Sequence, residues 1–201
     1  MKEIAAGIRT WSIFSQEKKI DFNGHLVAGG DGCVLIDPPP MTESDRQEAD
    51  GMGAMLAIII TNRHHTRDAA AAGERWGAPI LIHEADAEGL PPGVRIGGTY
   101  RDGDHLAGGL TVMGLADQKS PGESALLCTR ANALILGDAL IGAPPGSLRM
   151  LPDDKYADAA KARAGLKRLL DLRFDALLLG DGASIPQGGR RAVESFLQTA
   201  R

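Results

Sequence analysis

The chain has 201 residues, 43% of them hydrophobic, a formal net charge of −4 and an isoelectric point near 5.7. This length is enough for one compact domain over residues 1–201 with a sizeable buried core. The acidic balance and the lack of any basic run argue against a nucleic-acid partner, because nucleic-acid-binding proteins carry a dominant basic face.

The first half of the chain alternates predicted strands with short helices. Two apolar runs joined by the turn Gly29 to Gly32 predict a β-hairpin from Asp21 to Asp37. A phosphate-binding loop is less favoured at these glycines, because a β-branched run and three prolines follow instead of a helix. The elements predicted next are a helix from Thr42 to Ala49, a strand from Leu56 to Thr61, a helix from Asp68 to Trp76, a strand from Ala78 to Ile82 and a helix from His83 to Leu90.

The second half begins with three short apolar runs, separated by Gly, Pro and Asn, that predict antiparallel strands. A helix capped by Asp153 and Asp154, another strand and a last amphipathic helix follow. The predicted strands are Leu110 to Leu115, Ala125 to Thr129, Ala133 to Leu136 and Ala176 to Leu179. Together these elements predict a mixed pair of sheets covered by helices, with function at the polar strand ends.

The most polar strand end is the segment Thr61 to Asp68, where an apolar run ends in two histidines and two arginines. With Asp37 after the hairpin, the turn Ser120 to Gly122, and Asp138 and Asp181 after later strands, this order of landmarks resembles the metallo-β-lactamase superfamily. The resemblance covers nearly the whole chain. It implies an α/β fold, a four-layer αββα sandwich with a metal site at one edge between two sheets, and a hydrolase that attacks an ester-like or amide-like bond with a metal-bound water.

The leading metal-binding motif of that superfamily is altered here. Where the family has Thr-His-x-His-x-Asp-His, this chain reads Thr61-Asn-Arg-His-His-Thr-Arg67, so only His64 stands at a ligand position. By the same resemblance, Lys119 and Asp181 replace further histidines, whereas Asp138 keeps the bridging aspartate. The metal ligands that remain are His64, Asp138 and Asp181, and the implied catalytic residues are Asp138 and His64.

The cations at the altered positions argue against a two-metal centre. Arg67 and Lys119 would lie within a few ångströms of any ion, and like charges about 4 Å apart repel by about 4 kcal/mol at an effective dielectric near 20. We therefore expect at most one divalent metal, zinc or iron. Our hypothesis is that Arg67 and Lys119 pair with Asp138 and Asp181 and take over the electrostatic role of the metals.

Two functions stay open, each with a small molecule as the partner. One is a single-metal hydrolase. The other is a metal-free protein that binds a small anion through Arg67 and Lys119, since both groups bind carboxylate or phosphate. Asp37 is expected to orient the site from below or to cap the turn that follows it. His65 is expected to be a non-ligating neighbour and Asn62 to cap a helix entrance.

The two cysteines and His25 are interpreted first as structural residues. Cys33 and Cys128 lie in apolar runs without a CxxC spacing, which predicts buried small hydrophobic residues, with a catalytic thiol as the alternative. His25, within the hairpin, is expected to be structural or on the surface. Residues 1–7 lack the apolar core of a signal peptide, and no stretch reaches the roughly 20 apolar residues that span a bilayer. We therefore expect a cytoplasmic protein with no membrane partner.

Overall fold

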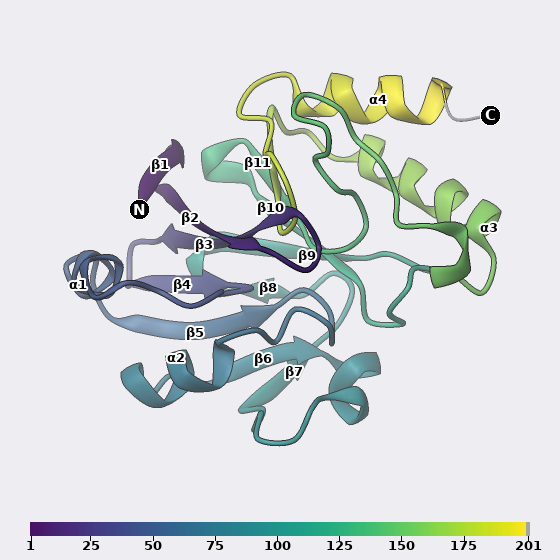
Figure 1. The fold of residues 1–201 in the computed structure, drawn as a ribbon. Helices are drawn as coiled ribbons and strands as arrows, with labels where there is room; N and C mark the ends of the chain where they lie inside the picture. Colours follow the sequence, from purple (N-terminus) through teal and green to yellow (C-terminus); the bar gives the residue numbers. More distant parts are fainter. Residues whose placement is uncertain (200–201) are drawn as a thin grey trace.

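The computed structural model describes residues 1–199, which form two β-sheets with helices on both outer faces (Figure 1). The first sheet has the strands β1 (Lys2–Ala5), β2 (Ile8–Ser15), β3 (Ile20–Ala28), β4 (Cys33–Ile36), β5 (Met55–Ile60), β6 (Ile80–His83) and β7 (Gly98–Tyr100), in that order. The second sheet has, in spatial order, β12 (Ala176–Leu179), β11 (Ala133–Leu136), β10 (Ser124–Cys128), β9 (Leu110–Gly114) and β8 (His105–Leu106).

The strand pairing follows the predicted connections. β3 and β4 form the antiparallel hairpin predicted around the glycine turn, and β9, β10 and β11 are antiparallel neighbours, as predicted. β4, β5, β6 and β7 run parallel, as do β11 and β12. The N-terminal strands β1 and β2 were not predicted. β2 is partly solvent-exposed and carries only a mixed polar and apolar pattern, so it lacks the continuous apolar run that marks β5.

Three apolar clusters account for the four layers. Side chains of both sheets meet in the inner cluster, which includes Val34, Ile59, Leu126, Ile135 and Leu178. A second cluster packs the outer face of the first sheet against helices, and a third does the same for the second sheet. Strands covered on both faces bury every side chain, which explains why β4, β11 and β12 read as uninterrupted apolar runs. The structure thus confirms the αββα sandwich.

Helices α1 (Glu43–Asp50) and α2 (Ala69–Trp76) cover the first sheet, whereas α3 (Ala159–Gly165) and α4 (Gly189–Thr199) cover the second (Figure 1). Thr42 caps α1 in a capping box with Asp45, in agreement with the predicted start. The predicted cap at Asp153 and Asp154 was wrong. Those residues form a single 3₁₀ turn, and α3 begins after Asp158, whose carboxylate accepts from the backbone N–H of Lys161 at 3.0 Å.

The two sheets are joined at the edge where the polar strand ends lie. The backbone N–H of Asn23 on β3 donates to the carbonyl of Gly180 at 2.7 Å. Its side-chain Nδ2 donates to the carbonyls of Leu179 and Gly182, both at 2.7 Å. These bonds hold the loop after β12, which carries Asp181, against the first sheet.

The structure also bears on the two cysteines and on possible membrane-spanning helices. Cys33 and Cys128 are both buried, as predicted. Within residues 1–199, no helix combines the length and the apolar character that a membrane crossing requires.

His25, on β3, is fully buried, and neither ring nitrogen has a hydrogen-bond partner among the described residues. Burial lowers the pKa of His25 from its ordinary 6.5 to about 4, since the opposing effect of the Asp37 charge is smaller. Between these pH values the unfolded chain takes up a proton that the folded chain excludes. We therefore expect the free energy of unfolding to fall by about 2–3 kcal/mol as the pH decreases through this window.

Urea denaturation of the wild type and of His25→Gln at pH 7 and at pH 4.5 measures this effect. The variant lacks the titrating ring, so it should lose less stability than the wild type on acidification. Equal losses in the two proteins would rule out His25 as the cause.

Candidate functional site

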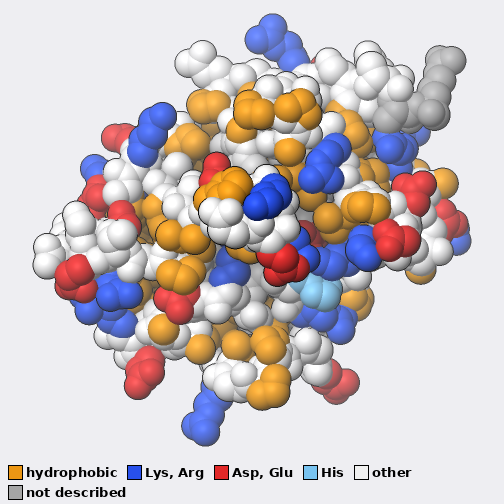
Figure 2. All heavy atoms as spheres, in the orientation of Figure 1, with side chains coloured by type: hydrophobic (Ala, Val, Ile, Leu, Met, Phe, Trp, Pro, Cys, Tyr) orange, Lys and Arg blue, Asp and Glu red, His pale blue; other side chains and the backbone are white. Residues whose placement is uncertain are grey.

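A cleft of about 430 Å³ opens at the edge where the ends of β5, β11 and β12 meet. Figure 2 shows a face of the molecule on which basic, acidic and hydrophobic side chains gather around a histidine. The predicted site residues that line the cleft are His64, Arg67, Lys119, Asp138 and Asp181, and His65 lines it as well. Asp37 is 1% exposed and lies outside the lining.

A short turn after β5 decides which of the two adjacent histidines faces inward. The side-chain Oδ1 of Asn62 accepts from the backbone N–H of His64 at 2.9 Å, and the carbonyl of Asn62 accepts from that of His65 at 3.0 Å. Asn62 therefore caps this turn and not a helix. His65 is buried beneath the cleft, whereas His64 is exposed at its surface.

His65 lies between two carboxylates. Its Nδ1 is 2.8 Å from Oδ2 of Asp37, and its Nε2 is 3.4 Å from Oδ1 of Asp138. Asp37 also accepts from the backbone N–H and the hydroxyl of Thr61, at 2.8 and 2.6 Å. The other oxygen of Asp138 accepts from Nζ of Lys119 at 2.8 Å. A line of alternating charges thus runs from Asp37 beneath the site to Lys119 at the cleft surface.

The pKa shifts in this line follow from the pairing. Burial and Arg67 disfavour the charged imidazolium, but Asp37 and Asp138 outweigh them and raise the pKa of His65 to about 10. Burial likewise disfavours the carboxylates, yet His65 holds the pKa of Asp37 below its ordinary value, and His65 with Lys119 does the same for Asp138. At neutral pH the line therefore consists of charged groups.

Arg67 holds the second carboxylate of the cleft and joins three segments. Nη2 donates to Oδ1 of Asp181 at 2.6 Å and to the carbonyl of Gly180 at 3.1 Å. Nη1 donates to the carbonyls of Asn23 and Asp37, at 2.6 and 3.2 Å. Four of the five donor hydrogens of the guanidinium are thus used inside the protein. Asp37 and Arg67 both have left-handed backbones (φ 46° and 37°), which cost on the order of 1 kcal/mol each.

The predicted ion pairs are confirmed, since Arg67 pairs with Asp181 and Lys119 with Asp138. Burial raises the pKa of Asp181 from its ordinary value despite the nearby His65 and Arg67 charges. Together with the pair formed by Asp37 and His65, three carboxylates face three cations. The cluster is therefore neutral without any added ion.

The donor atoms that could hold a metal differ from the predicted set in one residue. Among residues 1–199, one ligand atom each from His65, Asp138 and Asp181 lies within 4.8 Å of the others. The prediction placed His64 with these aspartates and treated His65 as a non-ligating neighbour. The turn at Asn62 reverses these roles, because it directs His65 into the protein and leaves His64 outside this group.

Asp86, which the sequence analysis did not single out, anchors the loop that carries Lys119. Its buried carboxylate accepts from the backbone N–H and Nε of Arg63, both at 2.9 Å, and from the backbone N–H of Gly122 at 3.1 Å. The hydroxyl of Ser120 also donates to it. Asp86 therefore ties the loop after β9 to the histidine-bearing turn, and so positions Lys119.

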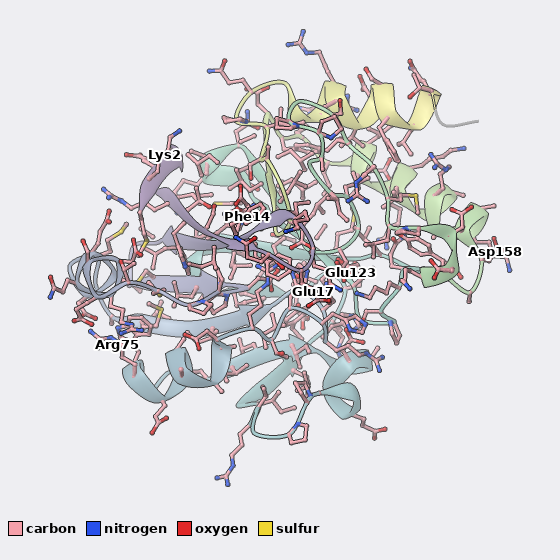
Figure 3. The ribbon with its side chains drawn as sticks, in the orientation of Figure 1. Lys2, Phe14, Glu17, Arg75, Glu123 and Asp158 are labelled. Atoms are coloured by element: carbon pink, nitrogen blue, oxygen red, sulfur yellow. The ribbon has the colours of Figure 1, made fainter. Side chains whose placement is uncertain are left out.

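Glu123 is a second residue that sequence reasoning missed. It is 1% exposed and lies among the side chains at the centre of the molecule, whereas Asp158 lies at the periphery (Figure 3). Its Oε1 accepts from the backbone N–H of Ala139 at 3.2 Å, and its Oε2 has no partner within the described part of the chain. Burial, reinforced by the Asp138 charge, raises the pKa of Glu123 well above its ordinary value and favours the uncharged acid.

Comparisons with known proteins agree with this architecture. A metallo-beta-lactamase from Pontibacter korlensis is 14% identical, with a TM-score of 0.77, over 100% of this chain and 98% of that chain. The metallo-beta-lactamase DIM-1 is 13% identical, with a TM-score of 0.78, over 100% of this chain and 97% of that chain. TTHA1623, solved in a di-iron-bound form, is 27% identical, with a TM-score of 0.69, over 90% of this chain and 96% of that chain.

The sequence comparisons found a match to a family model but none to an individual curated protein. No curated protein sequence matches the chain. The family model described as the metallo-beta-lactamase superfamily, however, matches residues 1–200. With the fold, the order of strand ends and this match in agreement, the chain belongs to the metallo-beta-lactamase superfamily.

Proposed function

We propose that this protein binds a small organic anion in its cleft and does so without a two-metal centre. The observation that carries the proposal is the closed set of ion pairs: the carboxylates of Asp138 and Asp181 are already matched by Lys119 and Arg67. Buried carboxylates require such partners, and these two have them within the chain. Two divalent cations in the same space would face repulsion from both side-chain cations.

The donor chemistry argues in the same direction. A dinuclear centre needs several neutral nitrogen or anionic oxygen ligands for each ion. Arginine and lysine only donate hydrogen bonds, so Arg67 and Lys119 cannot serve as ligands. The side-chain oxygen of Asn62 is already used by the backbone N–H of His64. A pair of metal ions therefore does not fit the residues present.

The lining of the cleft supports an anion as the ligand. Beyond the neutral cluster, the lining formed by residues 1–199 adds three further cations, Lys18, Arg149 and Lys155, and no further acid. Arg67 was predicted to contact the ligand, but its hydrogen bonds within the described part of the chain leave only Nε of the guanidinium unused. The cations available to a ligand are consequently Lys18, Arg149 and Lys155, which we call the rim cations, together with Lys119, which is 26% exposed.

The test is thermal unfolding in the presence of a panel of organic carboxylates and phosphates. A ligand present at 100 times its Kd should raise the free energy of unfolding by about 2.7 kcal/mol and Tm by roughly 5–10 °C. We expect the same shift with and without a metal chelator. A shift that disappears on chelation, or no shift with any anion, would contradict the proposal.

A second candidate function is single-metal hydrolysis. It is favoured by the group His65, Asp138 and Asp181, which has the three protein ligands of a catalytic site and a carboxylate, Asp37, behind the histidine. One divalent ion there would supply an activated water for hydrolysis. The related TTHA1623 was solved with di-iron, so iron and zinc are the ions to test. Hydrolysis that is lost on chelation and in Asp138→Ala would favour this candidate.

A further inference from the structure

We infer that the anion bound by the cleft is an organic carboxylate with an apolar tail, and that Arg149 holds its carboxylate. This inference rests on the proposed anion-binding function and names the ligand class and the residue that selects it. Three observations support it: Arg149 has no acidic partner among residues 1–199, its backbone is hydrogen-bonded to Ile141, and apolar side chains also line the cleft.

Arg149 is the rim cation without an acidic partner. Lys18 pairs with Glu17 at 2.7 Å and Lys155 with Asp154 at 2.9 Å. Among residues 1–199, the only side-chain hydrogen bond of Arg149 runs from Nη1 to the carbonyl of Met150 at 3.4 Å, and no acidic oxygen lies within 4.0 Å of the guanidinium. Its charge is therefore available to a ligand.

The backbone of Arg149 is fixed to the floor of the cleft. Its N–H donates to the carbonyl of Ile141 at 3.0 Å, and its carbonyl accepts from the N–H of Ile141 at 2.8 Å. Gly142, which follows Ile141 in the chain, donates its N–H to the carbonyl of Asp181 at 3.0 Å. The base of the Arg149 side chain is thus held in place, which reduces the conformational entropy that binding would cost.

Part of the cleft lining is apolar. Ile20 and Phe22 of β3 and Leu151 line the cleft, and all three side chains are partly exposed. Apolar area that remains in contact with water gives little stability to the free protein, but burying it against a hydrocarbon tail favours binding. A ligand that uses the whole cleft therefore needs an apolar part as well as a charge.

The charge of the ligand follows from the number of unpaired cations at the cleft. A guanidinium presents two parallel N–H groups that match two oxygens of a carboxylate or a phosphate. Arg149 supplies one unpaired positive charge beside a neutral cluster, so it balances a monoanion, whereas a compact dianion such as inorganic phosphate would keep one negative charge unbalanced and facing Asp138 and Asp181. A monoanion held at the rim, with its tail along Phe22 and Leu151, avoids this repulsion.

Isothermal titration calorimetry with acetate, butyrate, hexanoate and octanoate tests this inference on the full chain. Each buried methylene strengthens binding by up to about fourfold, so two added carbons should lower Kd by roughly 5–15-fold until the cleft is filled. The primary amide of each acid should bind at least about tenfold more weakly, because it lacks the charge that pairs with the guanidinium. Inorganic phosphate should bind more weakly than hexanoate.

Two arginine variants provide the matched comparison. Arg149→Gln should weaken octanoate binding about tenfold or more and remove the preference for the acid over its amide. Arg101→Gln removes an exposed arginine that lies outside the cleft lining, so it should change Kd less than about threefold. Both positions are exposed, and thermal unfolding of each variant without ligand checks that the fold is retained.

The outcomes separate the inference from the proposed function. A steep dependence on chain length that requires Arg149 supports it. Carboxylates that bind with no dependence on chain length, phosphate that binds best, or equal affinity in Arg149→Gln would overturn it while leaving anion binding intact. If no anion binds at all, the proposed function and this inference fail together.

Discussion

Replacing Arg67 by methionine should lower the free energy of unfolding by about 3–5 kcal/mol, and Tm by roughly 6–20 °C. The variant removes the partner of the Asp181 carboxylate and the guanidinium N–H donors that bind three backbone carbonyls, on Asn23, Asp37 and Gly180. The side chains of Arg67 and Asp181 are only 8% and 13% exposed, so water cannot fully replace these contacts. Urea denaturation followed by circular dichroism measures the loss.

Three comparisons make the Arg67 result interpretable. Arg67→Lys keeps the charge but loses the planar fork, and should lie between the wild type and Arg67→Met. Arg168→Met breaks an exposed ion pair with Asp102 and should have a much smaller effect. In the double variant Arg67→Met with Asp181→Leu, no unpaired carboxylate remains, so its loss should be smaller than the sum of the two single losses by at least about 1 kcal/mol. Additive losses would contradict the pairing.

Replacing His65 by glutamine is the second change with a large expected effect. It leaves two buried carboxylates, Asp37 and Asp138, without the imidazolium that lies between them. Removing one member of such a buried set costs about 3–5 kcal/mol. The loss should appear as a lower midpoint of urea unfolding at pH 7.

The control for His65 is His105, the exposed histidine of β8, whose replacement by glutamine should change stability by less than about 0.5 kcal/mol. Adding Asp37→Asn to His65→Gln should recover part of the loss, because one buried charge is removed together with its partner. A loss of less than about 1 kcal/mol in His65→Gln alone would show that the imidazolium does not carry the charge balance described here.

Much of the fold could be predicted from local pattern. The run Ala57 to Ile60 is apolar on both faces because it is a central strand, and Thr42 precedes a helix because its hydroxyl caps the first turn. The N-terminal strands could not be predicted in the same way, since β2 is a partly exposed strand with mixed polar and apolar side chains. The start of α3 was misplaced because Asp153, Asp154 and Asp158 are equally good caps by type, and only the packing of the chain selects Asp158.

The candidate site was predictable where it depends on strand ends. The pairs of Arg67 with Asp181 and of Lys119 with Asp138 follow from positions that the resemblance brings together. Which of the two histidines faces into the protein could not be predicted in this way, because it depends on one turn held by the side chain of Asn62. The role of Asp86 depends on contacts with residues 23–36 positions away, which no local pattern encodes.

The central claim is that side-chain cations, and not a pair of metal ions, balance the carboxylates of this cleft. Elemental analysis of the protein after incubation with zinc or iron(II) and dialysis, combined with an anomalous-scattering map of its crystals, measures this most directly. We predict less than stoichiometric metal, with Lys119 on Asp138 and Arg67 on Asp181. Two ions per chain, with both cations displaced toward solvent, would contradict the claim.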